Sequence, residues 1–295
     1  MGWDDVPTHF SFAFWQNSWD LENNVCFFVL FLCSKKVKKG LLFTDIIYGP
    51  IRSRRLGISL GVNLLPLQSK LCNFDCIYCE CGWNDDNRAE RPRFNSREDI
   101  REALRTTLSK MAEEGQLPDV ITFAGNGEPT IHPEFEAIID DTIALRDEFA
   151  PGAKVSVLSN ATQLHREGVR NALHKVDNAI LKLDSAIDAT AHTINKPQGD
   201  YSVERIVEQL KTFGRDFVLQ TMFLRGEYNG AGIDNTSERE LEAWLAMVEH
   251  LRPQSVMVYS IDRATPCQTL AKVEREELEK IADRVRALGI ECSAV

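Results

Sequence analysis

From about residue 58 onward, short apolar runs alternate with amphipathic segments, and this alternation restricts the fold more than any other feature of the sequence. The apolar runs have the length of buried strands, and the segments between them repeat apolar residues at helical spacing. The predicted strands cover residues 58–66, 119–123, 154–158, 178–183, 217–223 and 255–259. Repeated βα units with short links form a parallel sheet, so we predict an α/β fold that is either doubly wound or barrel-like.

The predicted helices have recognisable start and stop residues. Ser96 and Asp99 form a capping-box pattern before a helix that is predicted to end at Gly115, and Gly289 is placed to end the last helix. The other helices are predicted to start at Pro133 or to cover residues 164–173, 202–213, 237–251 and 273–288. In both kinds of parallel fold, ligands bind at the carboxyl ends of the strands. Functional residues are therefore expected just after a strand.

The composition excludes several classes of protein. The 295 residues carry a net charge of −10 and have a pI near 5.2, which argues against a broad nucleic-acid-binding surface. The longest apolar run, residues 25–33, has about half of the roughly 20 residues that a membrane-spanning helix needs. The cysteines are too sparse for a secreted disulfide scaffold, so we predict a cytoplasmic protein that does not enter a membrane.

Residues 1–40 differ from the rest of the chain. Their aromatic residues have no clear period, and their apolar run is followed by lysines, which is the reverse of the order in an export signal. We interpret residues 1–40 as an N-terminal extension, either disordered or a misassigned start, ahead of a single domain at 41–295. The functional alternative is a helix that covers one end of the fold or contacts a partner.

Three cysteines, Cys72, Cys76 and Cys79, lie close together directly after the first predicted strand. The residues between them are mostly polar or amphipathic, so core packing does not explain the spacing. Three thiolates in a Cys-x3-Cys-x2-Cys pattern suit an iron–sulfur cluster or zinc. A [4Fe–4S] cube takes four cysteines, so three leave one iron open to a small molecule. The alternative is a structural zinc site with Cys81 as the fourth ligand; we interpret Cys81 as a bystander.

A second motif, Gly125-Asn126-Gly127-Glu128-Pro129, follows the second predicted strand. Its glycines let the backbone approach a ligand closely, and its glutamate offers a carboxylate to an ammonium group. Taken alone, the motif is also compatible with an ordinary strand-to-helix turn.

Together the two motifs resemble those of the radical S-adenosylmethionine (SAM) superfamily. The cysteine pattern, with the aromatic Tyr78 before its last cysteine, resembles the superfamily's signature, and the second motif resembles its Gly-Gly-Glu-Pro element, with Asn126 in place of the second glycine. The resemblance implies a partial (βα)6 TIM-like barrel and a [4Fe–4S] cluster whose open iron binds SAM. It further implies reductive cleavage of SAM to a 5′-deoxyadenosyl radical that takes hydrogen from a substrate, and a flavodoxin- or ferredoxin-type electron donor.

The resemblance also implies that later strand ends contact SAM. The candidates, beside Tyr78 and the second motif, are Ser159, Asn160, Asp184 and Gln220. The alternative for each of them is a hydrogen bond within its own turn.

The lead-in at residues 48–63 resembles one branch of the superfamily, the wyosine-synthase-like iron–sulfur proteins, named for their tRNA-base chemistry. Arg54 and Arg55 in this segment, and Arg225 after the fifth strand, are candidate anion contacts for the substrate. The archaeal tRNA enzyme of that branch builds a second cluster from three upstream cysteines, whereas this chain has Cys26 and Cys33 there.

Three functions follow from these patterns. The first is a radical SAM enzyme acting on an unidentified substrate, with a tRNA base as one candidate. The second is an activating or maturing enzyme that acts on a partner protein. The third is a non-catalytic zinc or iron–sulfur module.

Overall fold

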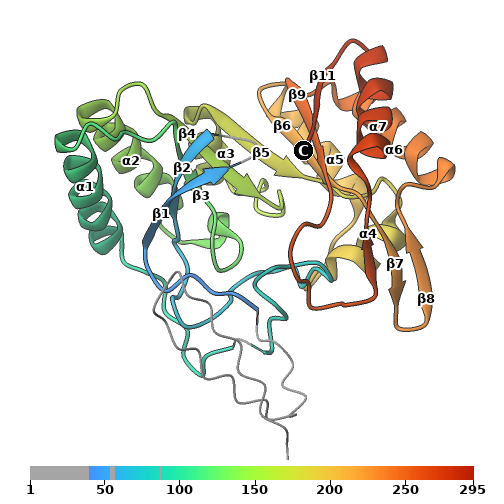
Figure 1. Ribbon diagram of the computed structural model, residues 1–295, viewed down its shortest axis with the longest axis horizontal. Coiled ribbons are helices and arrows are strands. Elements are labelled where there is room, and N and C mark those ends of the chain that lie inside the picture. The colour runs from blue at the N-terminus through green and yellow to red at the C-terminus, as the bar shows by residue number, and fades with distance from the viewer. Residues whose placement is uncertain (1–39, 54–56, 87) are drawn as a thin grey trace, which may run out of the picture. The chain divides into compact units, whose positions relative to one another are not determined.

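The main sheet contains all six predicted strands in the order in which they occur along the chain (Figure 1). The computed structural model describes residues 40–53, 57–86 and 88–295, so the interpretation of residues 1–39 and the candidates Arg54 and Arg55 lie outside the described residues. The sheet follows the order β1-β2-β3-β4-β5-β6-β9-β11. Its strands are β1 (Ile47–Ser53), β2 (Gly57–Val62), β3 (Val120–Phe123), β4 (Lys154–Ser159), β5 (Asn178–Lys182), β6 (Val218–Met222), β9 (Ser255–Tyr259) and β11 (Glu291–Ala294).

Every neighbouring pair from β2 to β11 is parallel. The order of these strands never reverses, which excludes the doubly wound alternative and gives the predicted partial barrel. Two edge strands were not predicted: β1, which pairs antiparallel with β2, and β11, which pairs with β9. The first predicted strand was too long at its end, because parallel pairing with β3 stops at Val62 and residues 63–66 begin the following loop.

Seven α-helices occur in the described part of the chain, and six of them were predicted. Figure 1 shows α1 and α2 beside the β2–β3 end of the sheet and α6 and α7 beside the β9–β11 end. The helices are α1 (Arg97–Glu113), α2 (Phe135–Phe149), α3 (Glu167–Lys175), α4 (Asp188–Asn195), α5 (Val203–Phe213), α6 (Glu238–Leu251) and α7 (Arg275–Ala287). The helix that was not predicted is α4. None of the described helices has the length and apolar character that crossing a bilayer requires.

Helix α1 illustrates how the sequence determines an element. Its buried residues, Ile100, Leu104, Leu108 and Met111, recur at helical spacing and pack into the main hydrophobic core. Helix α1 ends where Gly115 adopts a φ of +66° and the N–H of Gln116 donates to the carbonyl of Met111.

The N-cap of α1 gives a first prediction. Ser96 Oγ accepts a hydrogen bond from the backbone N–H of Asp99 at 3.1 Å, as the capping pattern predicted. We expect Ser96→Ala to lower the free energy of unfolding by about 1 kcal/mol, because that N–H loses its acceptor. Urea denaturation measures the change. Ser109→Ala, on the exposed face of the same helix, is the control, and an equal effect of the two substitutions would contradict a capping role.

A second, antiparallel sheet was not predicted. It has the order β10-β7-β8 and comprises β7 (Leu224–Tyr228), β8 (Ala231–Asp234) and β10 (Leu270–Lys272). Leu224 and Ile233 from this sheet form a separate hydrophobic cluster with Ile77 and Tyr78, which belong to the cysteine loop. The small sheet therefore packs against the loop that carries the three cysteines.

Candidate functional site

The structure brings the two sequence motifs into direct contact. The backbone N–H of Leu71 donates to the carbonyl of Asn126 at 2.8 Å, and the N–H of Glu128 donates to the carbonyl of Leu71 at 3.2 Å. Gly127 has a φ of +140°, and a Cβ atom there would lie 1.9 Å from the carbonyl oxygen of Leu71. A glycine is therefore required where the end of β3 passes the start of the cysteine loop.

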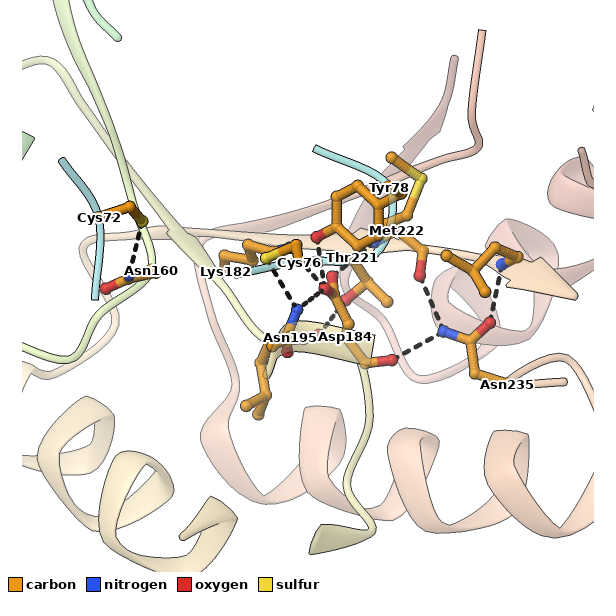
Figure 2. Close-up of polar contacts among 12 residues, drawn as sticks. Cys72, Cys76, Tyr78, Asn160, Lys182, Asp184, Asn195, Thr221, Met222 and Asn235 are labelled. Carbon is orange, nitrogen blue, oxygen red and sulfur yellow. Dashed lines mark hydrogen bonds and ion pairs between the residues drawn. The ribbon is translucent and has the colours of Figure 1, made fainter. Parts of the chain in front are cut away.

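The sulfur atoms of the cysteine loop face N–H donors. The Cys72 sulfur accepts a hydrogen bond from the backbone N–H of Phe74 at 3.4 Å, and Nδ2 of Asn160 lies 4.0 Å from it. Nδ2 of Asn195 donates to the Cys76 sulfur at 3.6 Å (Figure 2). Cysteines 72, 76 and 79 are partly buried and form no disulfide. N–H donors of this kind stabilise negative charge on sulfur.

The thiols of the loop differ in how readily they ionise. Burial, reinforced by the charge of Cys76, raises the pKa of the Cys72 thiol well above its usual range. Burial also raises the pKa of Cys76, to about 11. A hydrogen bond with Cys81 lowers the pKa of Cys79 to about 6, and the nearby Lys70 ammonium acts in the same direction. Cys79 is therefore the most easily ionised of the three.

Cys81, the candidate fourth ligand that was interpreted as a bystander, lies two residues after Cys79. Its buried thiol interacts with the Cys79 sulfur and donates to the carbonyl of Gly125 at 3.5 Å. Burial and the Cys79 hydrogen bond raise the pKa of Cys81, with the hydrogen bond as the larger cause. The Cys81 thiol therefore joins the end of the cysteine loop to Gly125 of the second motif.

Glu128 connects the ends of β3 and β4. Its Oε1 accepts hydrogen bonds from Ser159 Oγ at 2.9 Å and from the N–H and hydroxyl of Thr130, while Oε2 accepts from the Asn160 N–H at 2.7 Å. Burial raises the pKa of Glu128, although these hydrogen bonds oppose the shift. Pro129, the next residue, is buried at the start of a short 3-10 helix, Pro129–Ile131. The candidates Glu128, Ser159 and Asn160 therefore form one connected group.

Asn126 has a structural task in this arrangement. Its Nδ2 donates to the carbonyls of Phe43 and Pro66, both at 2.9 Å, and its Oδ1 accepts from the N–H of Phe43 at 2.8 Å. The side chain is fully buried and both of its polar ends are bonded. The residue that replaces the superfamily's second glycine thus joins the segments before and after β2 to the end of β3.

Asp184 is the centre of a buried network at the end of β5 (Figure 2). Its Oδ2 accepts hydrogen bonds from Tyr78 Oη at 2.6 Å, Asn195 Nδ2 at 2.6 Å and Lys182 Nζ at 2.5 Å. Its Oδ1 accepts from the N–H of Met222 at 2.9 Å. Asn195 also bonds to the Cys76 sulfur, so Asp184 positions that donor as well as Tyr78.

Lys182 supplies the positive charge opposite Asp184. Its Nζ lies 4.3 Å from the centre of the Tyr78 ring, and the lysine side chain is 13% exposed. Burial alone would lower the pKa of Lys182. The charges of Asp184 and Cys76 together outweigh burial, so the pKa of Lys182 lies above its usual range. The ammonium therefore lies between a carboxylate and a cysteine of the loop.

Two further predicted residues make other contacts. Gln220, buried in β6, donates from Nε2 to the Met257 sulfur at 3.6 Å. Arg225 forms hydrogen bonds with Glu277 of α7 and with Thr236, which couples β7 to α7. The guanidinium of Arg225 is therefore committed to an ion pair within the protein.

Sequence reasoning missed Asn195 and Lys70. Asn195 lies in the helix that was not predicted, and no local pattern links it to Asp184. Lys70 had a visible signal, because it is a charged residue two positions before the first cysteine. Its side chain is 1% exposed, and its Nζ donates to Asp75 and to the carbonyl of Gly82.

Two cavities lie at opposite ends of the strands of the main sheet. The larger, about 690 Å³, opens at the amino ends of the strands, where Val120, Lys154 and Ser255 line it. The smaller, about 400 Å³, lies beside the cysteine loop, where Asn73 and Phe74 line it together with Thr162, Tyr201 and Arg205. Ligands of parallel βα folds bind at the carboxyl ends, so the smaller cavity is the one placed for function.

Comparison with known proteins gives the family. Residues 69–236, more than half of the chain, match the Radical SAM superfamily. A UPF0026 protein of Helicobacter pylori is 30% identical over 242 residues, which cover 80% of this chain and 72% of the relative. A UPF0026 protein of Methanocaldococcus jannaschii is 32% identical over 198 residues, 65% of this chain and 59% of the relative.

Some relatives are longer than the region that matches. A GTPase Obg of Brachyspira hyodysenteriae is 27% identical over 253 residues, which cover 84% of this chain. The chain spans 35% of that relative, and 59% of the Methanocaldococcus protein.

Solved structures share the fold. A radical SAM methyltransferase from Sphaerobacter thermophilus superposes with a TM-score of 0.60 at 14% identity, covering 80% of this chain and 65% of the other. Streptococcus suis SuiB, bound to S-adenosylmethionine, gives 0.56 at 14% identity, covering 79% of this chain and 51% of SuiB. The structure of SuiB bound to its precursor peptide SuiA also superposes with a TM-score of 0.56, at 15% identity. The match covers 79% of this chain and 49% of SuiB.

Radical SAM enzymes use a [4Fe–4S] cluster and SAM. The chemistry of the cysteine loop fits such a cluster: three thiols without disulfides, N–H donors to the Cys72 and Cys76 sulfurs, and a lowered pKa at Cys79. Among the described residues, no three His, Cys, Asp or Glu side chains are arranged to hold a single metal ion, whereas a cube binds each cysteine through a different iron. The chain belongs to the radical SAM superfamily and, with the Helicobacter and Methanocaldococcus relatives, to the UPF0026 proteins.

Proposed function

We propose that Cys72, Cys76 and Cys79 hold the [4Fe–4S] cluster and that SAM binds beside it, against the segment Gly125–Pro129. The observation that carries this proposal is the pairing of Leu71 with Gly127, which holds the cysteine loop against the second motif. When bound, the cluster and SAM supply a 5′-deoxyadenosyl radical for hydrogen abstraction from substrate. The protein's own residues position these groups and limit the access of water.

The network around Asp184 is proposed to preserve the geometry of this site. Asn160 and Asn195 face the sulfurs of Cys72 and Cys76, and Asp184 fixes both Asn195 and Tyr78. Four of the proposed SAM-binding positions are held in place because each is hydrogen-bonded to a buried partner. These positions are Tyr78, Ser159, Asn160 and Asp184. Rigid, pre-positioned groups lose little freedom when a ligand binds.

For the substrate we propose first the wyosine-synthase-like branch and a tRNA base. The segment at residues 48–63 supports this branch, and its Tyr48 packs so closely on Gly61 that a Cβ atom at residue 61 would overlap the ring. The second candidate is a partner protein or peptide, which is supported by the shared fold with SuiB, a protein whose structure is known with its precursor peptide. We further propose a cytoplasmic location and a flavodoxin- or ferredoxin-type electron donor.

Anaerobic reconstitution followed by electron paramagnetic resonance (EPR) tests the proposed function. The dithionite-reduced protein should give a [4Fe–4S] signal that changes when SAM is added. Cys79→Ala should lose the signal and most of the bound iron, whereas Cys81→Ala should keep both. A signal that SAM leaves unchanged would refute the SAM site, and a full signal in Cys79→Ala would refute the assignment of ligands.

Mass spectrometry separates the two substrate classes. Modified nucleosides from the tRNA of a deletion strain are compared with those of the wild type and of a complemented strain. Loss of one modified nucleoside, restored by the intact gene and not by the Cys79→Ala gene, would support a tRNA base. An unchanged profile would reject the tRNA candidate and leave the partner protein as the substrate to identify.

A further inference from the structure

A lysine ammonium is buried inside the cysteine loop. Lys70 Nζ donates to the carbonyl of Gly82 at 2.6 Å and to Asp75 Oδ1 at 3.3 Å. Asp75 lies between the first and second cysteines, and Gly82 follows the third, so the ammonium is bonded to both halves of the loop. The N–H of Gly82 in turn donates to the carbonyl of Cys79 at 2.9 Å, and Asp75 is next to Cys76 in the chain, so both partners of the ammonium adjoin cysteines of the loop.

The hydrogen bond to the backbone carbonyl of Gly82 does not by itself explain why a charged ammonium is buried at residue 70. A lysine side chain that is 1% exposed has lost its hydration, which is costly unless negative charge lies nearby. Asp75 supplies part of that charge, but its side chain is 18% exposed and it also accepts a hydrogen bond from the N–H of Asn84 at 2.8 Å. The ammonium is therefore the deeper member of the pair, and water screens the carboxylate more strongly.

When bound to a cluster as thiolates, the cysteines of the loop would supply further negative charge near Lys70; among them Cys79 raises the pKa of Lys70 most, followed by Cys72. A cluster held by these thiolates becomes more negative by one unit when it accepts an electron. A fixed cation beside it stabilises the reduced state more than the oxidised state, and low local dielectric strengthens the interaction.

We propose that Lys70 is a positioning residue whose buried ammonium raises the reduction potential of the cluster bound by Cys72, Cys76 and Cys79. The inference rests on the proposed function, because it requires a cluster at these cysteines. The step involved is a one-electron reduction: a low-potential flavodoxin- or ferredoxin-type donor is oxidised by one electron and the cluster is reduced by one. No proton transfer is required.

Redox titration of the anaerobically reconstituted protein, monitored by EPR without SAM, tests this role. Lys70→Gln removes the cation and should lower the midpoint potential of the cluster. At a fixed potential, the ratio of reduced to oxidised cluster should fall about tenfold, which corresponds to a shift of about 59 mV for a one-electron couple. Asp75→Asn removes the opposing charge and should shift the potential upward. Lys175→Gln, which removes a half-exposed lysine paired with Glu136 and Asp140, should leave the potential unchanged.

Iron and sulfide contents identify the variants that carry a full cluster. Unchanged potentials in Lys70→Gln and Asp75→Asn at full occupancy would overturn the proposal. If Lys70→Gln does not retain the cluster, Asp75→Asn decides: an upward shift supports the charge effect, and an unchanged or lower potential refutes it. Failure of the proposed function is distinguished by the wild type, which would then show no EPR signal that responds to SAM.

Discussion

Replacing Asp184 with asparagine is expected to destabilise the protein by about 3 kcal/mol, because the substitution leaves the ammonium of Lys182, whose side chain is 13% exposed, without the carboxylate that pairs with it. Asp184 is 1% exposed, and its two oxygens accept four hydrogen bonds. An asparagine amide retains one oxygen and presents an NH2 group to donors that need an acceptor. The measurement is urea denaturation of proteins with matched iron content.

Two comparisons separate this buried pair from an ordinary ion pair. Asp200→Asn breaks an exposed pair with Arg205, in which the side chains are 83% and 50% exposed, and should cost less than about 1 kcal/mol. Adding Lys182→Met to Asp184→Asn removes the unpaired charge and should recover part of the lost stability. Equal effects of Asp184→Asn and Asp200→Asn would show that burial of Lys182 does not control the stability of this region.

The same substitution should also disturb the site. Tyr78 loses its acceptor and Asn195 loses the partner that directs its Nδ2 toward the Cys76 sulfur. Residues 78 and 184 are separated by 106 positions, so the coupling of the cysteine loop to the end of β5 depends entirely on tertiary structure.

The parts of this structure that were predictable are those with local signals. Buried parallel strands are continuous apolar runs, which made the six central strands visible, and capping residues marked the start of α1. The contact between the two motifs was also foreseeable, because they follow neighbouring parallel strands, β2 and β3, and the carboxyl ends of such strands meet at one edge of the sheet. The choice between a doubly wound sheet and a barrel could not be made from the sequence, because it depends on which strands pair with one another in the sheet.

What could not be predicted depends on partners far away in the chain. The hydrogen bonds of Glu128 with residues in the turns after β3 and β4 were not predicted, because they join segments that are distant in the sequence. The bonds of the Asn126 side chain with Phe43 and Pro66 were not predicted for the same reason. Short strands such as β8 and β10, at four and three residues, carry too little periodicity to be recognised.

Gly127→Ala is expected to displace the cysteine loop and to abolish stable binding of the cluster. The backbone φ of +140° belongs to a region that only glycine adopts readily, with a cost of about 1–3 kcal/mol for other residues. The added Cβ would also lie 1.9 Å from the carbonyl oxygen and 2.5 Å from the carbonyl carbon of Leu71, so backbone must move, at a further cost of about 1–3 kcal/mol. Leu71 immediately precedes Cys72, and its movement carries the first cysteine away from the others.

Iron content after anaerobic reconstitution and urea denaturation measure the two consequences of this substitution separately. Gly152→Ala is the matched control, because a Cβ there meets nothing within 4 Å and its φ is not positive. The control should retain both stability and iron. If Gly127→Ala lost stability but bound iron normally, the loop would not depend on the end of β3 for its position. If it lost iron and stability together, the contact between Leu71 and Gly127 would be what holds the three cysteines in register with the sheet.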